Sequence, residues 1–187
     1  MLMAYDAKTG KELWSFDVGL GISAPPITYS INGRQYISIL VGFGGGFAGL
    51  GGASAAALGW AYGVHTRRVI TLSIEGKASL PPQPAKSFPK PVIDTEFKVE
   101  DSLVAKGGML FGYCGVCHGG GVMAPNLEAS PVPLVADAFA AVVQKGGRVD
   151  KGMPSFPNLS DQDLLSIRHY IRQVANNSVQ AKEVSAR

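Results

Sequence analysis

The chain has 187 residues, which is enough for one ordinary domain or two small ones. Its net charge is +3 and only 17% of its residues are charged, so the composition gives no support to a nucleic-acid-binding protein. The chain contains only two cysteines, Cys114 and Cys117, which excludes a disulfide framework.

The first part of the chain has the alternating apolar pattern of short β-strands. A turn over Ala7–Gly10 and a second turn at Asn32-Gly33 separate such runs, and Asn-Gly between alternating apolar segments is the strongest short hairpin signal. The strands that we expect are Leu2–Asp6, Glu12–Val18, Ile27–Ile31, Gln35–Val41 and Val69–Ile74.

Residues Val41 to Val64 contain no charged side chain, a length that matches a membrane span. Nine of these 24 positions are glycine, and bulky aliphatic residues are few. We therefore expect a glycine-rich loop buried in a β fold and no transmembrane span.

A proline-rich stretch follows at Ala78–Lys98, with five prolines. Proline fixes φ and removes a backbone donor, so this segment is expected to be an extended, semi-rigid linker. The sequence thus predicts three parts: residues 1–77 as β structure, residues 78–98 as linker and residues 99–187 as a separate domain.

The third part has helical periodicity. Helices are expected at Lys98–Tyr113, at Val135–Gln144 and at Ser160–Val174, the last with Ser160 and Asp163 as a capping box. Gly107-Gly108 within the first of these helices suggests the close approach of another helix.

Cys114-Gly115-Val116-Cys117-His118 is a C-x-x-C-H motif, which is typical of covalent c-type haem attachment. Two thiols at this spacing reach the two vinyl groups on one porphyrin edge, and the histidine is held over the iron. A thioredoxin-type thiol pair would need a βαβ setting, which is absent from the predicted elements. A zinc site would need a further ligand pair, because adjacent Cys and His cannot easily fill two corners of a tetrahedron.

Met153 is the candidate for the sixth iron ligand. It lies in a loop flanked by Gly152 and Pro154, with no helix from which to pack, and a thioether opposite an imidazole suits haem iron and raises its potential. Met109, on the first helix, and Met123, close to the attachment motif, are weaker candidates.

Two further residues have expected roles around such a haem. The carbonyl of Pro125 is placed to accept the free ring N–H of His118, although a plain turn proline explains it almost as well. Arg148 is a candidate partner for a haem propionate, with a solvated surface arginine as the alternative.

Residues Val99–Val174 resemble a class I cytochrome c domain. In that family an N-terminal helix crosses a C-terminal helix with a glycine at the crossing and an aromatic residue opposite, which Gly107 and Tyr170 match. The resemblance implies His118 and Met153 as axial ligands.

Residues Ala4–Phe16 resemble the blade motif of pyrroloquinoline-quinone (PQQ) dehydrogenases, and residues 24–39 resemble their last propeller blade. A last blade, a proline-rich linker and a cytochrome c domain follow one another in quinohaemoprotein alcohol dehydrogenases. The implied fold is an N-terminal all-β partial propeller blade and a C-terminal all-α cytochrome c domain. PQQ and calcium are implied only for the complete parent enzyme, whose other blades would hold them, so no catalytic residue is assigned here.

The function implied is electron transfer through haem c, from reduced quinone to an external periplasmic acceptor, either a small redox protein or a quinone. The alternatives are a stand-alone cytochrome c carrier and an inactive dehydrogenase fragment, so whether the chain is itself an enzyme stays open. Its first residues lack the pattern of a secretory signal, whereas c-type haem is normally attached outside the cytoplasm. We therefore expect a signal peptide upstream of Met1 and a periplasmic location.

Overall fold

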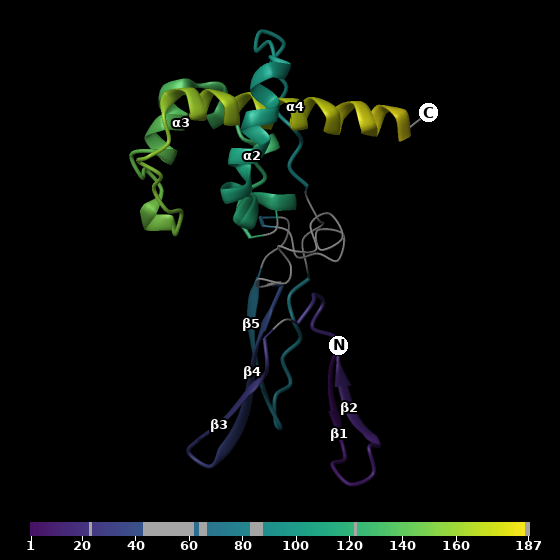
Figure 1. Ribbon diagram of the computed structural model, residues 1–187. Coiled ribbons are helices and arrows are strands. Elements are labelled where there is room, and N and C mark those ends of the chain that lie inside the picture. Colours follow the sequence, from purple (N-terminus) through teal and green to yellow (C-terminus); the bar gives the residue numbers. More distant parts are fainter. Residues whose placement is uncertain (23, 43–61, 64–66, 83–87, 122, 186–187) are drawn as a thin grey trace. The chain divides into compact units, whose positions relative to one another are not determined.

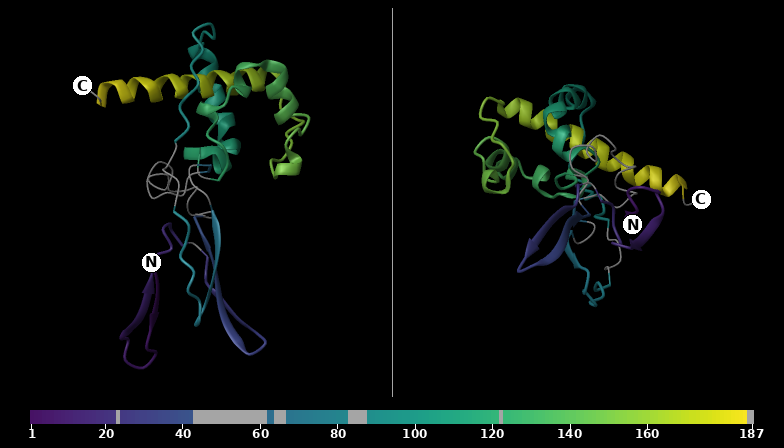
Figure 2. Two further views of the ribbon diagram at one scale, coloured as in Figure 1. Left: turned by 180° about the vertical axis from the view of Figure 1, so that it is seen from behind. Right: turned by 90° about the horizontal axis from the view of Figure 1, so that it is seen from below.

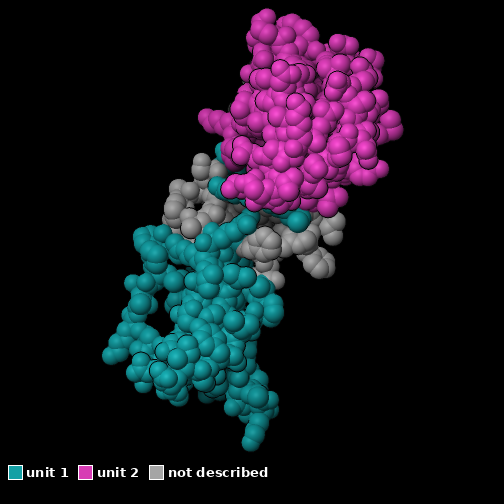
Figure 3. Space-filling model, turned by 90° about the vertical axis from the view of Figure 1, so that its left-hand side faces the viewer, with its two compact units in different colours: residues 1–88, 120–124 teal, residues 89–119, 125–187 magenta. Residues whose placement is uncertain are grey.

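The computed structural model describes residues 1–22, 24–42, 62–63, 67–82, 88–121 and 123–185. The chain forms two compact units, the first comprising residues 1–88 with 120–124 and the second residues 89–119 with 125–187 (Figure 3). Strands β1 to β5 belong to the first unit and helices α2 to α4 to the second (Figure 1). The predicted fold class, a β part followed by a helical part, is confirmed.

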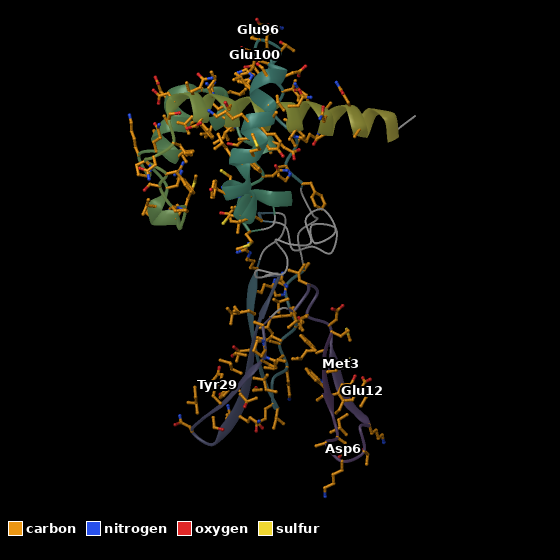
Figure 4. All side chains as sticks on the ribbon, in the orientation of Figure 1. Met3, Asp6, Glu12, Tyr29, Glu96 and Glu100 are labelled. Atoms are coloured by element: carbon orange, nitrogen blue, oxygen red, sulfur yellow. The ribbon has the colours of Figure 1, made fainter. Side chains whose placement is uncertain are left out.

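The first unit begins with an antiparallel hairpin of β1 (Leu2–Tyr5) and β2 (Glu12–Phe16). Asp6 lies in its turn (Figure 4), where one carboxylate oxygen accepts hydrogen bonds from the backbone N–H groups of Lys8 and Thr9 at 3.0 and 2.8 Å and from the Thr9 hydroxyl at 2.8 Å. These bonds, with that of the Thr9 hydroxyl first, hold the pKa of Asp6 below its usual value. The turn is thus fixed by a side chain as well as by glycine.

A three-stranded antiparallel sheet follows, in the order β3 (Ile27–Ile31), β4 (Arg34–Val41) and β5 (Arg68–Ser73). Asn32 and Gly33 both have positive φ, at 51° and 77°, which is the geometry of a type I′ hairpin turn. The expected strands and this turn are confirmed, with ends that differ by at most two residues.

Among its described residues, the first unit has a small core cluster. The buried side chains of this cluster are Val18, Ile39, Val41 and Ile70. Several large apolar side chains on the strands remain exposed, among them Leu13, Ile27, Ile31 and Val69.

The second unit contains three helices, α2 (Asp101–His118), α3 (Ala136–Val143) and α4 (Asp161–Ser185). α2 crosses α4, and α4 continues beyond the crossing towards the C-terminus (Figures 1 and 2). The sequence had placed the ends of two of these helices too early, at Tyr113 and Val174. α2 continues through the C-x-x-C-H motif, and α4 continues because its last eleven residues contain neither Gly nor Pro, although their apolar periodicity has ended.

The α2–α4 crossing depends on Gly107. A Cβ at this position would lie 2.9 Å from Tyr170 Cβ and closer still to the carbonyl of Ser166. Tyr170 also packs against Phe111, with ring centroids 5.0 Å apart. The expected glycine and aromatic residue at the crossing are therefore confirmed.

The capping box at the start of α4 is also present. The Ser160 N–H donates to Asp163 at 3.0 Å, and the Asp163 N–H donates to the Ser160 hydroxyl at 3.2 Å. Behind it lies the main core of the second unit, formed by the buried residues Phe139, Val143, Leu164, Ile167 and Ile171.

The proline-rich stretch has no helix or strand in its described residues, 78–82 and 88–98. Its last residues, from Pro89 onward, are grouped with the second unit. The glycine-rich loop expected within Val41–Val64 lies mostly outside the described residues. Within the described part of the chain, no helix has the length and apolar character needed to cross a membrane.

Candidate functional site

The C-x-x-C-H motif occupies the last turns of α2. Because an α-helix has 3.6 residues per turn, Cys114 and His118 share a face and Cys117 lies beside them. Cys114 is half-buried, Cys117 is exposed and both are free thiols. The helix therefore presents two sulfurs and one imidazole along a single edge.

His118 is oriented by the loop that follows it. Its Nδ1 lies 2.7 Å from the carbonyl oxygen of Pro125, and because a carbonyl only accepts, Nδ1 must carry the proton. The Nε2 lone pair is then left for a metal. This hydrogen bond is the one expected from the sequence, whereas its role at an iron stays a prediction.

Glycines directly after the motif allow the chain to turn back, so that the Pro125 carbonyl reaches the His118 ring. Gly120 and Gly121 have φ values of 64° and 65°, a region that side-chain-bearing residues rarely adopt. Neither glycine had a predicted role, although the run Gly119-Gly120-Gly121 directly after His118 was the available signal.

The thiols do not have the character of a redox or zinc pair. Burial raises the pKa of the Cys114 thiol, with a smaller contribution from Cys117, whereas a thioredoxin-type nucleophile has a lowered pKa. No group of three or more His, Cys, Asp or Glu side chains with metal-site geometry occurs among the described residues. Two free thiols beside one histidine leave covalent attachment as the chemistry that this motif supports best.

Met153 lies in the loop after the short helix η4 (Val149–Lys151). Gly152 turns the chain with a φ of 86°, and the Met153 N–H donates to the Arg148 carbonyl at 3.2 Å. The Met153 side chain is half-buried against the core cluster of α3 and α4. Met153 therefore lies outside any helix, as expected, and its loop places the side chain against the core.

The other two methionines are placed differently. Met109 precedes His118 by nine residues, which puts it on the opposite side of α2, and its side chain is 75% exposed. Met123 is grouped with the first unit, whereas His118 and Met153 both belong to the second. The exposure of Met109 on the far side of α2 thus favours Met153 over it.

Arg148 contributes through its backbone. Its carbonyl oxygen accepts hydrogen bonds from the N–H groups of Lys151 and Met153, and the residue is exposed. The expected pairing of its guanidinium with a haem propionate stays a prediction.

The donor set fits a covalently attached haem. Two free thiols at C-x-x-C-H spacing, an imidazole whose Nε2 is available and a thioether against an apolar core all lie in one unit. The haem would be tethered by Cys114 and Cys117 and ligated by His118 and Met153.

Family models match two separate parts of the chain. Residues 104–171 match the family described as cytochrome C oxidase, cbb3-type, subunit III, and residues 1–37 match the β-propeller domain of glucose/ethanol/alcohol dehydrogenases.

Whole-protein comparisons agree with these matches. The chain is 37% identical over 194 residues to the dehydrogenase subunit of the quinone alcohol dehydrogenase of Gluconobacter oxydans, covering 98% of this chain and 24% of that protein. It is 34% identical over 179 residues to the quinohaemoprotein alcohol dehydrogenase ADH IIB of Pseudomonas putida, covering 90% of this chain and 25% of that protein.

A solved structure of quinohaemoprotein alcohol dehydrogenase ADHIIG from P. putida aligns with a TM-score of 0.72 at 31% identity, over 95% of this chain and 26% of that one. The Comamonas testosteroni enzyme aligns with a TM-score of 0.59 at 29% identity, over 94% of this chain and 25% of that one. The chain therefore spans about a quarter of the length of these relatives.

Proposed function

Since this chain comprises the last propeller blade and the cytochrome c domain of the quinohaemoprotein alcohol dehydrogenase family, we propose that its haem domain relays electrons from a reduced quinone to an external acceptor. Electron transfer is the general role of a cytochrome c domain. The donor, the acceptor and the direction of transfer are the specific part of the proposal.

One observation carries the proposal: His118 donates from Nδ1 to Pro125 and so keeps Nε2 available, on the same helix edge as the two thiols. Haem c, when bound, supplies a one-electron iron couple in an apolar setting. The residues of this chain hold and tune that couple. Cys114 and Cys117 tether, His118 and Met153 ligate, and the Pro125 carbonyl orients the imidazole and increases its basicity.

In the complete enzyme, an alcohol would be oxidised at a site of PQQ and calcium formed by the other propeller blades. The two electrons released there would leave singly through the haem domain. The acceptor would be a small redox protein or a quinone in the periplasm. No PQQ ligand, calcium ligand or catalytic base is assigned within these 187 residues.

The exposed apolar side chains of β1 to β5 support a second statement about the chain by itself. These strands form only a small core and leave surfaces that further blades would cover. We therefore expect the isolated chain to transfer electrons but not to oxidise alcohols.

The test uses the haem-loaded chain. Spectroelectrochemical titration should show one reversible one-electron transition, and the reduced protein should be re-oxidised by a small soluble redox protein. Alcohol with added PQQ and calcium should give no haem reduction. Irreversible or absent reduction would contradict the electron-transfer role, and alcohol-dependent reduction would contradict the need for further blades.

A further inference from the structure

The last part of the proline-rich stretch is fixed to the helical unit. We call residues 89–100 the strap. This segment contains no helix or strand, bends at residues 95–97 and leads into α2; Glu96 and Glu100 are labelled in Figure 4. The Val92 N–H donates to the Glu128 carbonyl at 2.8 Å, and the Glu100 N–H donates to His169 Nδ1 at 3.0 Å. The strap is therefore bonded near both of its ends.

Arg172, in the middle of α4, is the main anchor. Its side chain is buried, at 2% exposure, and donates to the Val92 carbonyl at 2.9 Å and to the carbonyls of Leu127 and Ser130 at 2.8 and 3.3 Å. One guanidinium thus joins the strap to α4 and to the segment around the short helix η2 (Leu127–Ala129). Its fork of donors is what permits three acceptors at once, and an ammonium group does not have that geometry.

His169 is the second anchor, three residues earlier on α4. It is 5% exposed, its ring lies 4.9 Å from the Phe97 ring of the strap, and its Nδ1 accepts from Glu100 N–H. The Arg168 guanidinium also lies over the Phe97 ring, 5.3 Å from its centre. Because an N–H cannot be the acceptor, Nδ1 must be unprotonated for this bond to exist.

We propose that Arg172 and His169 form a clamp that makes residues 89–100 part of the haem unit, and that acidification opens the His169 half of the clamp. The proposal goes beyond electron transfer and holds whether or not the haem accepts electrons from a quinone.

The electrostatic surroundings of His169 give the sign of the pH effect. Burial lowers its pKa from the ordinary value, the Glu100 carboxylate raises it and the Arg168 guanidinium lowers it further. With a lowered pKa, the contact is complete above about pH 6.5, the ordinary pKa of histidine, and is lost as the pH falls below that value.

Trypsin tests the clamp in the haem-loaded full chain. The linker offers Lys86, whereas Lys90 is followed by Pro91 and is resistant, so Lys98 is the site that reports on the strap. In the wild-type chain we expect a red fragment that begins at Ser87. In Arg172→Met the bond after Lys98 should be cut at least tenfold faster, which gives a fragment that begins at Val99.

Gln173→Ala is the matched control, because Gln173 is adjacent on α4 and its side chain bonds Asn177 instead of the strap. It should behave as wild type. The haem absorption spectrum of each variant shows whether the helical unit is still folded. Equal cutting after Lys86 and Lys98 in the wild-type chain would overturn the proposal.

The pH-dependent half has its own test, in amide hydrogen exchange at Glu100. His169→Asn keeps an acceptor oxygen near the position of Nδ1 but does not titrate. We expect the protection of Glu100 in the wild type, relative to this variant, to fall as the pH is lowered below about 6.5, the ordinary pKa of histidine. A ratio that stays constant down to the pH at which the haem spectrum reports unfolding of the helical unit would show that His169 is no switch.

Discussion

His118 is the residue on which the site depends. It is fixed by its position on α2 and by the 2.7 Å hydrogen bond to Pro125, which together set the direction of the ring and the identity of its free nitrogen. Met153 is fixed differently, by a loop whose backbone is bonded to Arg148 and whose side chain rests on the core. The two expected axial ligands thus come from different kinds of element, one from a helix and the other from a loop.

Replacing Met153 by Ala should remove the thioether ligand while leaving attachment at the two cysteines intact. The oxidised protein should then gain a high-spin signal, and its reduction potential should fall by a sizeable part of the roughly 0.8 V range that axial ligands span. Absorption and electron paramagnetic resonance spectra with a redox titration measure both effects. Met109→Ala is the control, since that side chain is exposed on the far side of α2; an unchanged spectrum in Met153→Ala would rule this ligand out.

The sequence identified the site residues more readily than their surroundings. Cys114, Cys117 and His118 lie within five consecutive residues, so their spacing alone predicts haem attachment. The packing of Met153 against the core depends on a fold that brings distant residues together. The buried polar residues His169 and Arg172 on α4 were missed for the same reason, because periodicity arguments count apolar positions and treat charged ones as solvated.

At the scale of elements, the crossing of α2 and α4 organises the helical unit. The helices approach closely because Gly107 lies against the Ser166 backbone and Tyr170. The sequence predicted this crossing, since paired glycines inside a helix are unfavourable unless another element needs the space. The ends of α2 and α4 were placed too early, because both helices continue beyond the last residues with apolar periodicity.

Gly107→Ala should destabilise the helical unit by about 1–3 kcal/mol, because the added methyl group overlaps atoms that cannot easily move. Gly112→Ala is a control on the same helix. A Cβ there meets nothing within 4 Å, so the variant should be more stable by about 0.5–1 kcal/mol. Denaturant unfolding followed by far-ultraviolet circular dichroism distinguishes the two, and equal effects would mean that the crossing is not tightly packed.

Asp163 joins the start of α4 to α2. Its carboxylate is 2.7 Å from Lys106 Nζ and also bonds Ser160, and these contacts, led by that of Lys106, lower its pKa from 3.8 to about 2. A lowered pKa means that the contribution to stability is complete above about pH 4 and is lost as the pH falls through about 2. Asp163→Asn should therefore lower the melting temperature at neutral pH and flatten its dependence on pH in the acid range. Asp161→Asn, in the same helical turn, should retain that acid dependence.

At the scale of the molecule, the two units differ in how many of their apolar side chains are buried. The helical unit has a contiguous core and a bonded strap, whereas the described part of the β unit has four buried apolar residues and many exposed ones. Strand positions and the Asn32-Gly33 turn were predictable from local pattern. The parts that cover the strands were not predictable, because they depend on residues outside these five strands.

The two units should therefore unfold separately. Both tryptophans, Trp14 and Trp60, lie in the first part of the chain, so their fluorescence reports on that part, while haem absorption reports on the helical unit. We expect the fluorescence transition at a clearly lower denaturant concentration than the loss of the haem band. Coincident transitions would show that the β unit is as stable as the helical one, contrary to this account.

The most direct test is the mass and colour of the chain made in cells that attach c-type haem. Intact-protein mass spectrometry should show one added haem that survives acid denaturation, and the reduced protein should have the sharp α band of a low-spin c-type cytochrome. Both signals should vanish in Cys114→Ala/Cys117→Ala. A colourless wild-type product, or one that carries zinc in place of haem, would contradict the account.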